Sequence, residues 1–248
     1  ILTSYLTRPQ WVGVALAAGN LGETKNSGYE IELKHNNRIN EDLSYNVGLT
    51  YSHARNEIIS MDEPELKTAY RKREGNPISQ YFGLIAEGFV TQADLDNPDF
   101  PVSTFGAVKV GDLKYKDANG DGFIDDRDES RIGYSDIPEN TYALSLGVNY
   151  KGWGFSVMFQ GVDHVSRYYD AEAMYAFVSG GKVKEHHLER WNPAQSEAYN
   201  LQHANYPLLH YDNYGDHNQR TNSFFLKNGS FVRLKNIELS YTLPENWS

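Results

Sequence analysis

The sequence predicts an all-β fold made of antiparallel strands, and three observations support this prediction. Apolar and polar residues alternate with a period of two over several stretches of about ten residues, as in strands whose two faces differ. The composition favours strands and turns, since the 248 residues include 18 Tyr, 11 Phe, 4 Trp and 21 Gly. Short polar turns join some of these stretches directly, which is typical of hairpins.

The first predicted hairpin covers residues 28–52. Its first strand, 28–38, sets an apolar row against a charged row: Tyr29, Ile31 and Leu33 against Glu30, Glu32 and Lys34. The second strand, 43–52, has one apolar face made of Leu43, Tyr45, Val47, Leu49 and Tyr51. The polar stretch between the two strands is short enough for a hairpin turn.

A second hairpin is predicted over residues 142–161. Its first strand has an apolar face made of Tyr142, Leu144, Leu146, Val148 and Tyr150. After the turn Lys151–Gly152, the next strand presents Trp153, Phe155, Val157 and Phe159.

A last strand is predicted in residues 230–244. Alternation through Val232 and Leu234 resumes in the other phase at Ile237. One extra residue in a strand reverses its faces, so this slip around Asn236 predicts a β-bulge.

Two long segments, about 91–139 and 163–229, connect the strands and are rich in Asp, Asn, Pro, Gly and Tyr. Compact soluble domains rarely contain such long structureless connections, whereas outer-membrane barrels have long loops at one end. Residues 180–191 predict a short helix within the second segment. The chain has no run of about 18 apolar residues, and its mean hydropathy of −0.62 suits barrel strands, in which only every second residue is apolar.

The apolar face of the predicted sheet allows two architectures. In a sandwich this face packs on a second sheet, whereas in a membrane barrel it meets lipid. Aromatic residues near strand ends are typical of bilayer interfaces; these are Tyr51, Tyr142, Tyr150, Trp153 and Tyr241. Faces rich in Ser and Thr also suit a soluble sheet, so the pattern alone leaves both architectures open.

Charge and cysteine content exclude several classes. The formal net charge of −10 argues against a nucleic-acid partner. Without cysteine the chain forms no disulfide and no thiolate metal site. The opening stretch ILTSYLTRPQ lacks the pattern of a signal peptide, so for an exported protein we expect this sequence to be a mature piece or a fragment.

The stretch DANGDGFIDDRD, residues 117–128, has the ligand spacing of a calcium loop. Calcium prefers six to eight oxygen ligands, and the loop supplies them at positions 1, 3, 5, 7, 9 and 12, namely Asp117, Asn119, Asp121, the Phe123 carbonyl, Asp125 and Asp128. Gly122 permits the sharp turn at position 6. Asp128 stands where Glu is usual, which predicts weaker binding. The flanks predict loop and strand, so a structural site is expected rather than a sensor. The alternative is a turn that holds no metal.

Other candidate sites are weaker. The adjacent His186 and His187 do not form the HExxH arrangement and are interpreted as part of a solvated loop. Three further histidines recur every seven residues, but Pro207 breaks any helix that would align them: His203, His210 and His217.

Catalytic motifs are also missing from the sequence. Carboxylate pairs such as Asp125 with Asp126, or Glu30 with Glu32, lack an accompanying acid, and no nucleophile elbow or phosphate loop is found. We therefore predict no catalytic residue, no cofactor other than calcium, and no enzyme activity. Seven tyrosines of the second long segment either stack on cargo or pack the loop itself: Tyr168, Tyr169, Tyr175, Tyr199, Tyr206, Tyr211 and Tyr214.

Residues 111–161 resemble the signature region of the SusC/RagA family of TonB-linked outer-membrane transporters of Bacteroidetes. The shared features, in order, are Gly-Asp, Lys-Tyr-x-Asp, the DxNGDGxI loop, Ile-Gly, a Pro before a Tyr, a Gly-centred strand and Phe-Gln-Gly. Supporting similarities lie in NSGYEIEL (26–33), YFGLIAEGFV (81–90), RWNP (190–193) and SFVRLKNIELSYTLP (230–244). The resemblance covers nearly the whole chain.

The resemblance implies that residues 1–248 are a C-terminal portion of an antiparallel, 22-stranded transmembrane β-barrel, without its plug and final strands. It implies TonB-dependent import of oligosaccharides or peptides across the bacterial outer membrane, with a SusD-like lipoprotein closing the extracellular mouth. The segments 91–139 and 163–229 would be extracellular, and calcium would stiffen the first. Two alternatives are a soluble, calcium-stabilised β-sandwich that binds carbohydrate, and a secreted hydrolase with a carboxylate pair across a cleft.

Overall fold

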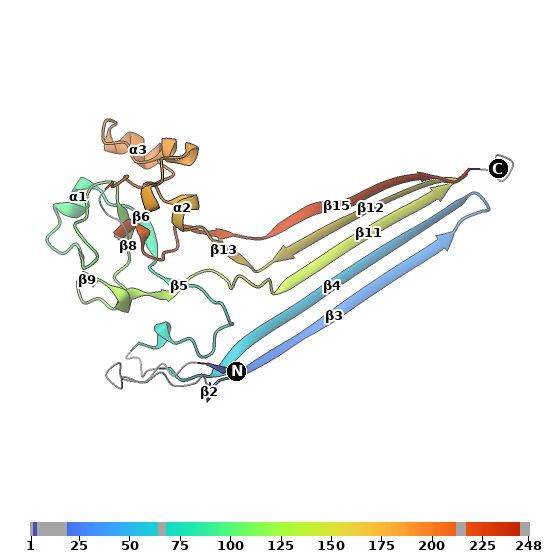
Figure 1. Cartoon of the computed structure of the whole chain (residues 1–248), viewed down its shortest axis with the longest axis horizontal. Coiled ribbons are helices and arrows are strands. Elements are labelled where there is room, and N and C mark those ends of the chain that lie inside the picture. The colour runs from blue at the N-terminus through green and yellow to red at the C-terminus, as the bar shows by residue number, and fades with distance from the viewer. Residues whose placement is uncertain (1, 4–18, 64–67, 212–216, 244–248) are drawn as a thin grey trace.

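The structure is a computed structural model and describes residues 2–3, 19–63, 68–211 and 217–243. It consists of a long antiparallel sheet and a compact group of connections at one end of that sheet (Figure 1). We call this group the cap; it comprises residues 61–63, 68–139, 164–211 and 217–230. None of the described helices is long and apolar enough to cross a membrane.

The sheet has five strands in the order β15-β12-β11-β4-β3, all antiparallel to their neighbours. Their bounds are β3 Glu23–Arg38, β4 Leu43–Ser60, β11 Asn140–Tyr150, β12 Trp153–Asp163 and β15 Phe231–Tyr241. Both predicted hairpins are therefore confirmed. The sheet places β4 beside β11 and β12 beside β15, although long connections separate these pairs in the sequence.

Short turns close the end of the sheet opposite the cap. In the β3–β4 turn, the N–H of Ile39 donates to the carbonyl of Leu43 at 2.9 Å. The β11–β12 turn has Lys151 at φ 47° and Gly152 at φ 84°. Two consecutive positive φ angles match the right-handed twist of the flanking strands, which explains why a two-residue turn suffices here.

The strands differ from the prediction mainly in length. β3 begins at Glu23 and β4 ends at Ser60, because these strands continue as a two-stranded ribbon beyond the sheet, where alternation is no longer visible in the sequence. The predicted bulge is confirmed. Met158 pairs with Asn236 and Phe159 with Leu234, so Lys235 is the extra residue.

The cap is built from short elements. Its strands are β5 Phe82–Gly83, β6 Ala86–Phe89, β7 Val102–Ser103, β8 Leu113–Tyr115, β9 Phe123–Ile124, β10 Ser130–Arg131, β13 Ser166–Tyr168 and β14 Leu226–Asn228. Its helices are α1 Gln92–Leu95, α2 Ala171–Met174 and α3 Glu197–His203, with 3-10 turns η2 Ala69–Arg71, η3 Asp126–Asp128, η4 Val178–Gly180, η5 Glu185–Glu189 and η6 His217–Gln219. A further strand pair outside the cap joins β1 Leu2–Thr3 to β2 Gly19–Asn20. The helix predicted at 180–191 is thus only the 3-10 turn η5.

The cap has a buried core of its own. Leu84, Leu113 and Phe225 are fully buried, and their cluster also includes Tyr115, Ile124, Tyr175, Val178 and Tyr206. Phe225 packs edge-on against Tyr175 with ring centroids 5.1 Å apart. The two long segments that were expected to be loops therefore pack against each other and share one core.

Candidate functional site: the membrane face and the cap

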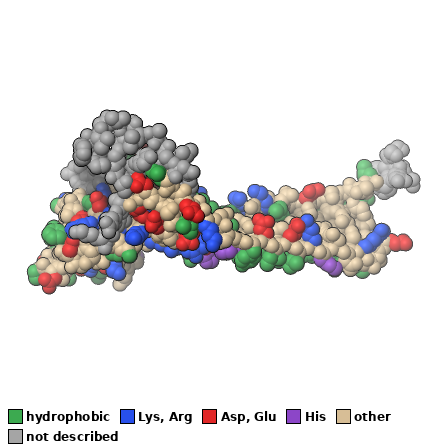
Figure 2. All heavy atoms as spheres, turned by 90° about the horizontal axis from the view of Figure 1, so that it is seen from below, with side chains coloured by type: hydrophobic (Ala, Val, Ile, Leu, Met, Phe, Trp, Pro, Cys, Tyr) green, Lys and Arg blue, Asp and Glu red, His purple; other side chains and the backbone are tan. Residues whose placement is uncertain are grey.

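The register of the sheet arranges apolar side chains in rows on one face. One row joins all five strands and consists of Leu33, Leu49, Leu144, Phe159 and Leu234. The next row towards the turns includes Val47, Leu146, Val157 and Ile237. Leu33 is 59% exposed and Ile237 is 61% exposed, so no described element covers this face, and Figure 2 shows its apolar side chains along one side of the sheet. A sandwich would bury these rows against a second sheet, which the described residues do not provide.

Aromatic side chains border the apolar rows at both ends. Towards the turns, Trp153 and Tyr241 pack with ring centroids 4.7 Å apart, beside Tyr150. Towards the cap, Tyr51 pairs with Tyr142 across β4 and β11. The eight-residue step from Tyr142 to Tyr150 spans about 20 Å along the membrane normal for a strand tilted by about 40°, which is close to the apolar band of outer-membrane barrels. The predicted aromatic belts therefore lie at the heights that a bilayer requires.

The other face of the sheet is polar. The row beside Leu144 consists of Glu32, Thr50, Ala143, Gln160 and Arg233. Small residues leave two open hollows on this face, one of about 350 Å³ lined by Gly48 and Ser145 and one of about 450 Å³ lined by Ser52 and Ala143. In a closed barrel such a face lines the lumen. Glu30 and Glu32 both lie on this face of β3, side by side rather than across a cleft, so they do not form the pair of a glycosidase.

All six predicted calcium ligands lie in the described part of the cap. In the loop between β8 and β10, side-chain oxygens accept hydrogen bonds from the loop's own backbone. Asp117 accepts from the N–H groups of Gly120 (2.7 Å) and Gly122 (2.8 Å). Asn119 accepts from the N–H of Asp121 (2.8 Å), and Asp121 accepts from the N–H of Phe123 (3.0 Å). Gly120 and Gly122 have φ of 72° and 81°, which glycine adopts without steric cost. The carboxylates at positions 1 and 5 thus turn inward onto the loop's own backbone.

Arg127 lies among these acidic side chains. Its guanidinium is 2.6 Å from Asp125 and 2.8 Å from Asp121, and its hydrogen bond lowers the pKa of the Asp125 carboxyl. The buried Asp128 accepts from the N–H groups of Ala118 (2.9 Å) and Asp125 (2.8 Å). In the part of the chain that the structure describes, no cluster of three or more His, Asp or Glu side chains is arranged to hold a metal ion. The oxygen donors suit calcium chemically, but in this arrangement Arg127 pairs with two of them, Asp121 and Asp125. Calcium binding stays a prediction.

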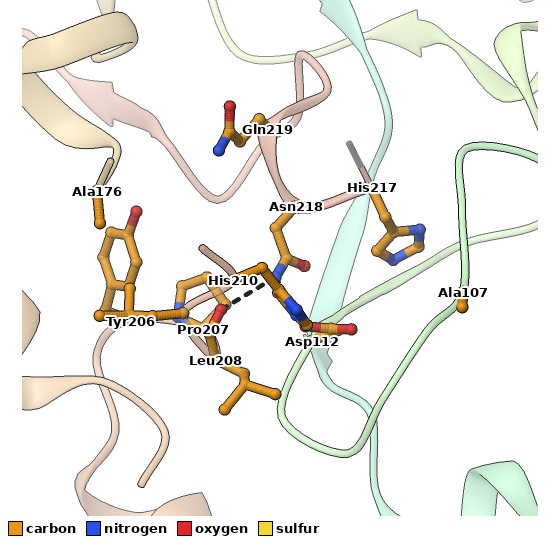
Figure 3. A pocket seen from close by; sticks show the side chains of 11 residues that line it. Ala107, Asp112, Ala176, Tyr206, Pro207, Leu208, His210, His217, Asn218 and Gln219 are labelled. Atoms are coloured by element: carbon orange, nitrogen blue, oxygen red, sulfur yellow. Dashed lines mark hydrogen bonds and ion pairs between the residues drawn. The ribbon is translucent and has the colours of Figure 1, made fainter. Parts of the chain in front are cut away.

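A small pocket in the cap joins β8 to the segment after α3. Buried Asp112 accepts from His210 Nε2 (2.5 Å), Asn218 Nδ2 (2.8 Å) and the N–H of Lys109 (2.8 Å). Figure 3 shows the side chains of Asp112, His210 and Asn218 lying close together. The space open to water between them is only about 20 Å³. That volume holds about one water molecule and excludes a sugar ring or a peptide. We interpret these hydrogen bonds as a structural link between the segment that contains Asp112 and the segment after α3.

The adjacent histidines are more ordered than predicted. His187 is buried; its Nδ1 accepts from the N–H of Lys184 at 2.8 Å, so its Nε2 carries the proton and donates to the carbonyl of Met174 at 2.9 Å. The Nε2 of His186 lies 3.0 Å from the same oxygen. Burial lowers the pKa of His187. The prediction of a solvated pair is wrong for His187, because the pair holds the end of α2.

The other histidines do not form one site. His203 is exposed on α3, whereas His210 binds Asp112 and His217 is buried between Ser103 Oγ (2.8 Å) and the carbonyl of Leu113 (2.6 Å).

The loop tyrosines divide between the two predicted roles. Tyr175 and Tyr206 are buried in the cap core, and burial raises the pKa of both phenols. Tyr169, Tyr199 and Tyr211 are 48%, 47% and 83% exposed, so they remain available to a ligand or partner. Tyr214 lies outside the described residues.

Sequence reasoning missed the residues that hold the cap together. Asp112 and Asn218, and Arg220 with its ion-pair partner Asp126, are about a hundred positions apart in the sequence. Their local sequence carries no periodic signal that would identify these partners. The role of Arg127 could have been predicted from the sequence, since it is a lone cation inside an acidic loop.

Comparisons with known proteins agree with the geometry. No protein-family model matches the chain. Over 96% of its length the chain is 23% identical to "TonB-dependent receptor P3" and 25% identical to "TonB-dependent receptor P26", both from Formosa agariphila, and it covers 24% of each. The relatives are receptors and not enzymes.

Solved structures show a similar fold. The RagAB peptide transporter matches with a TM-score of 0.64 and 20% identity over 96% of this chain, and the RagAB peptide importer in its open-open state with 0.66 and 19% over 98%. The chain covers 25% of each of those chains, so it spans about a quarter of the length of the relatives it matches. The resemblance and the fold class predicted from the sequence are confirmed, and so is the outer-membrane location that these relatives share.

Proposed function

We propose that this chain, a segment of the barrel of a SusC/RagA-type TonB-dependent outer-membrane transporter, takes part in the active import of oligosaccharides or peptides. The observation that carries the proposal is the five-stranded sheet, with one apolar and one polar face kept in register across every strand. Such a wall separates lipid from an aqueous passage, since side chains alternate between the two sides of a barrel strand.

Each part of the chain has a role in this proposal. The rows around Leu144 and Leu146 meet lipid, and the row of Glu32, Thr50 and Gln160 faces the passage. The cap lies at the end opposite the short turns, which is the extracellular end of an outer-membrane barrel. Its folded core holds the mouth in a defined shape, so cargo and partner meet a preorganised surface.

The proposed partners lie at the two ends of the transporter. A SusD-like lipoprotein would contact the cap, and the TonB complex would act through a plug region. Supporting the first contact, the cap exposes large apolar side chains that its own core does not use: Val183, Leu188, Leu201 and Tyr211. RagAB, whose fold is similar, is described as a peptide importer, and a peptide cargo is therefore one of the two classes proposed here.

Single-cysteine labelling tests the membrane placement. In the full-length transporter in native membranes, cysteines at Leu49 and Leu146 should react with a lipid-dissolved probe, and cysteines at Thr50 and Ser145 with an aqueous probe. The matched pairs are adjacent on the same strands and differ only in face. Protection of both leucine positions from both probes would contradict the proposal, because it would indicate a buried core.

Growth experiments test the cargo. A strain lacking the full-length gene should lose growth on the imported oligosaccharides or peptides as sole nutrient and keep growth on their monomers. Complementation with the intact gene should restore growth, and complementation in a strain without TonB should not. If the deletion strain grew as well as the strain with the intact gene on every polymer, an import role would be contradicted, and the membrane placement would still stand.

We also propose that the loop 117–128 binds Ca²⁺ with Asp117, Asn119, Asp121, the Phe123 carbonyl, Asp125 and Asp128. The ligand spacing and the three inward-turned side chains support this proposal. Arg127 would have to leave Asp121 and Asp125 when the ion enters, so the arginine and the ion compete for the same carboxylates.

Calorimetric titration of the full-length transporter with CaCl₂ tests the calcium proposal. Asp117→Asn should abolish binding, and Asp126→Asn, a non-ligand in the same loop, should leave it unchanged. Arg127→Gln should tighten binding, because it removes the competing cation. The proposal fails if the wild type shows no saturable heat, or if Asp117→Asn binds like the wild type.

A further inference from the structure

The chain contains two Asn-Gly pairs, and one of them lies in the loop 117–128. The pairs are Asn119–Gly120 and Asn228–Gly229. Asparagine followed by glycine is especially prone to deamidation, because glycine has no side chain to hinder attack of its backbone nitrogen on the asparagine side chain. The reaction replaces the side-chain amide with a carboxylate. The hydrogen bonds around each pair therefore indicate whether the fold promotes or opposes this reaction.

In the loop, a base and a hydrogen-bond donor adjoin the atoms that would react. The N–H of Gly120, whose nitrogen is the nucleophile, donates to Asp117 Oδ1 at 2.7 Å. The other oxygen of Asp117 accepts from the N–H of Gly122 at 2.8 Å, which fixes the carboxylate in place. Asn119 Oδ1, on which negative charge develops during attack, accepts from the N–H of Asp121 at 2.8 Å. Both contacts lie within the distances at which a general base and an oxyanion donor act.

The surroundings of this pair leave room for the reaction. The Asn119 side chain is folded back along the loop, since its Nδ2 also donates to Asp121 Oδ2 at 3.1 Å. Gly120 is exposed, and a Cβ built on it would meet no atom within 4 Å. Water therefore reaches the pair, and no neighbouring side chain blocks ring closure.

The second pair shares one of these contacts and lacks the other. Asn228 Oδ1 accepts from the N–H of Ser230 at 2.9 Å, just as Asn119 Oδ1 accepts from the residue two positions on. The N–H of Gly229, however, donates to the backbone carbonyl of Val165 at 2.9 Å. A backbone carbonyl is not a base that can take a proton. Asn228–Gly229 is therefore a matched internal control for the role of Asp117.

We propose that Asn119 is a site of self-catalysed deamidation in which Asp117 is the general base. The Gly120 nitrogen bonds to the side-chain carbonyl carbon of Asn119 and closes a five-membered imide, while Asp117 takes the proton from that nitrogen. The bond from the same carbon to Nδ2 breaks, and Nδ2 leaves as ammonia with the proton that Asp117 held. Water then opens the imide at one of its two carbonyls and leaves aspartate or isoaspartate at position 119.

The product changes the loop for which we propose calcium binding. Aspartate at position 119 adds a charged oxygen at the third ligand position, which strengthens calcium binding, whereas isoaspartate lengthens the backbone by one carbon and disturbs the ligand spacing. A bound ion would in turn occupy Asp117 and protect Asn119. This consequence rests on the proposed calcium site. The reaction itself does not, so it is tested without calcium.

Peptide mapping of the full-length transporter tests the proposal. The protein is kept in detergent at neutral pH with EDTA, either folded or denatured in guanidinium chloride, and is sampled over several weeks. Trypsin places the two pairs in separate peptides, residues 117–127 and 228–233, because each follows a lysine and ends at an arginine. Mass spectrometry with fragmentation then measures aspartate and isoaspartate at Asn119 and at Asn228.

Two variants separate the base from the local charge. Asp117→Asn keeps an acceptor for the Gly120 N–H but removes the base. Asp126→Asn removes a carboxylate from the same loop whose ion-pair partner is Arg220. In each variant the rate at Asn228 reports whether the cap is folded, because unfolding would release Gly229 from its backbone partner and raise that rate to the denatured value.

We expect Asn119 to deamidate about ten-fold faster in the folded wild type than in the denatured protein, and Asn228 to deamidate more slowly when folded. Asp117→Asn should slow the reaction at Asn119 about 100-fold, and Asp126→Asn should leave it unchanged. An unchanged or faster reaction in folded Asp117→Asn would overturn the proposal, because the carboxylate would then be inert or protective. Equal rates at Asn119 in the folded and denatured wild type would also overturn it, and this comparison needs no variant to fold.

Discussion

The sheet and the cap solve the problem of burial in different ways. The sheet satisfies its backbone through strand pairing but leaves Leu33 and Ile237 more than half exposed, so its apolar surface depends on lipid. The cap buries Leu84, Leu113 and Phe225 completely within itself. The difference teaches that two kinds of hydrophobic surface occur in one chain: one that needs lipid to cover it, and one that the chain buries within itself.

The largest expected effect tests the independence of the cap. Phe225→Ala removes a fully buried ring and should destabilise the cap by about 3–5 kcal/mol. Hydrogen exchange of the full-length transporter should show faster exchange in residues 82–132, 166–211 and 217–228, and little change in β11 and β12. The control Tyr211→Ala, at a site 83% exposed, should change little. Uniform loss of protection in the sheet and the cap would mean that they are one cooperative unit.

The sheet should respond to a charge on one face only. Leu146→Arg places a cation near the middle of the apolar band and should cost about 2–4 kcal/mol of barrel stability, whereas Ser145→Arg on the adjacent polar-face position should cost less than about 1 kcal/mol. Denaturant unfolding of the full-length transporter in lipid vesicles measures both. Similar costs for the two variants would remove the distinction between the lipid face and the passage.

Packing strain should be local to the cap. Gly111 has φ 95°, and a Cβ placed there would overlap the ring of buried Trp191. Gly111→Ala should therefore destabilise the cap by about 1–3 kcal/mol. Gly88→Ala is the matched control, because Gly88 also has positive φ but faces open space. Excess protease cleavage of the cap in Gly111→Ala over Gly88→Ala would isolate the contribution of Trp191, and equal cleavage would assign the effect to the backbone alone.

Acid should weaken the cap and not the sheet. Burial lowers the pKa of His187, and protonation would place a second N–H against the N–H of Lys184. Because the folded pKa is below the unfolded value of about 6.5, this stabilisation is complete above that pH and is lost as pH falls, by at most about 1.4 kcal/mol per pH unit.

Groups around His187 define the control for that experiment. The cations Lys184 and Arg190 oppose its protonation, and the ring of Tyr206 packs edge-on 4.7 Å away. Exchange of residues 171–206, corrected for intrinsic rates, should accelerate between about pH 7.5 and pH 5.5. His187→Asn, which retains an acceptor but does not titrate, should abolish the acceleration, and exposed His203→Gln should not. Persistent acceleration in His187→Asn would assign the pH response to another group.

The sequence predicted the sheet far better than the cap, for a physical reason. Alternation in 43–52 and 142–150 reflects two environments on the two sides of a strand, so the hairpins, the faces and a bulge around Asn236 could be predicted; the structure places its extra residue at Lys235. The cap strands have two or three residues, too few for a period to appear, and depend on distant pairs such as Asp112 with His210. Of the candidate site, the spacing of 117–128 was readable, but the position of Arg127 among its carboxylates required three dimensions.

The order of strands also has a kinetic consequence. The hairpins β3–β4 and β11–β12 close over turns of a few residues, but β4 reaches β11 only after residues 61–139 and β12 reaches β15 only after 164–230. Closing those long connections costs roughly 3 kcal/mol more in chain entropy than closing a tight turn. When the cap folds first, it shortens both distances before any strand of one hairpin meets the other. The cap then determines the order in which the strand pairs form. A variant such as Phe225→Ala should slow formation of the β4–β11 pair, while each hairpin can still form.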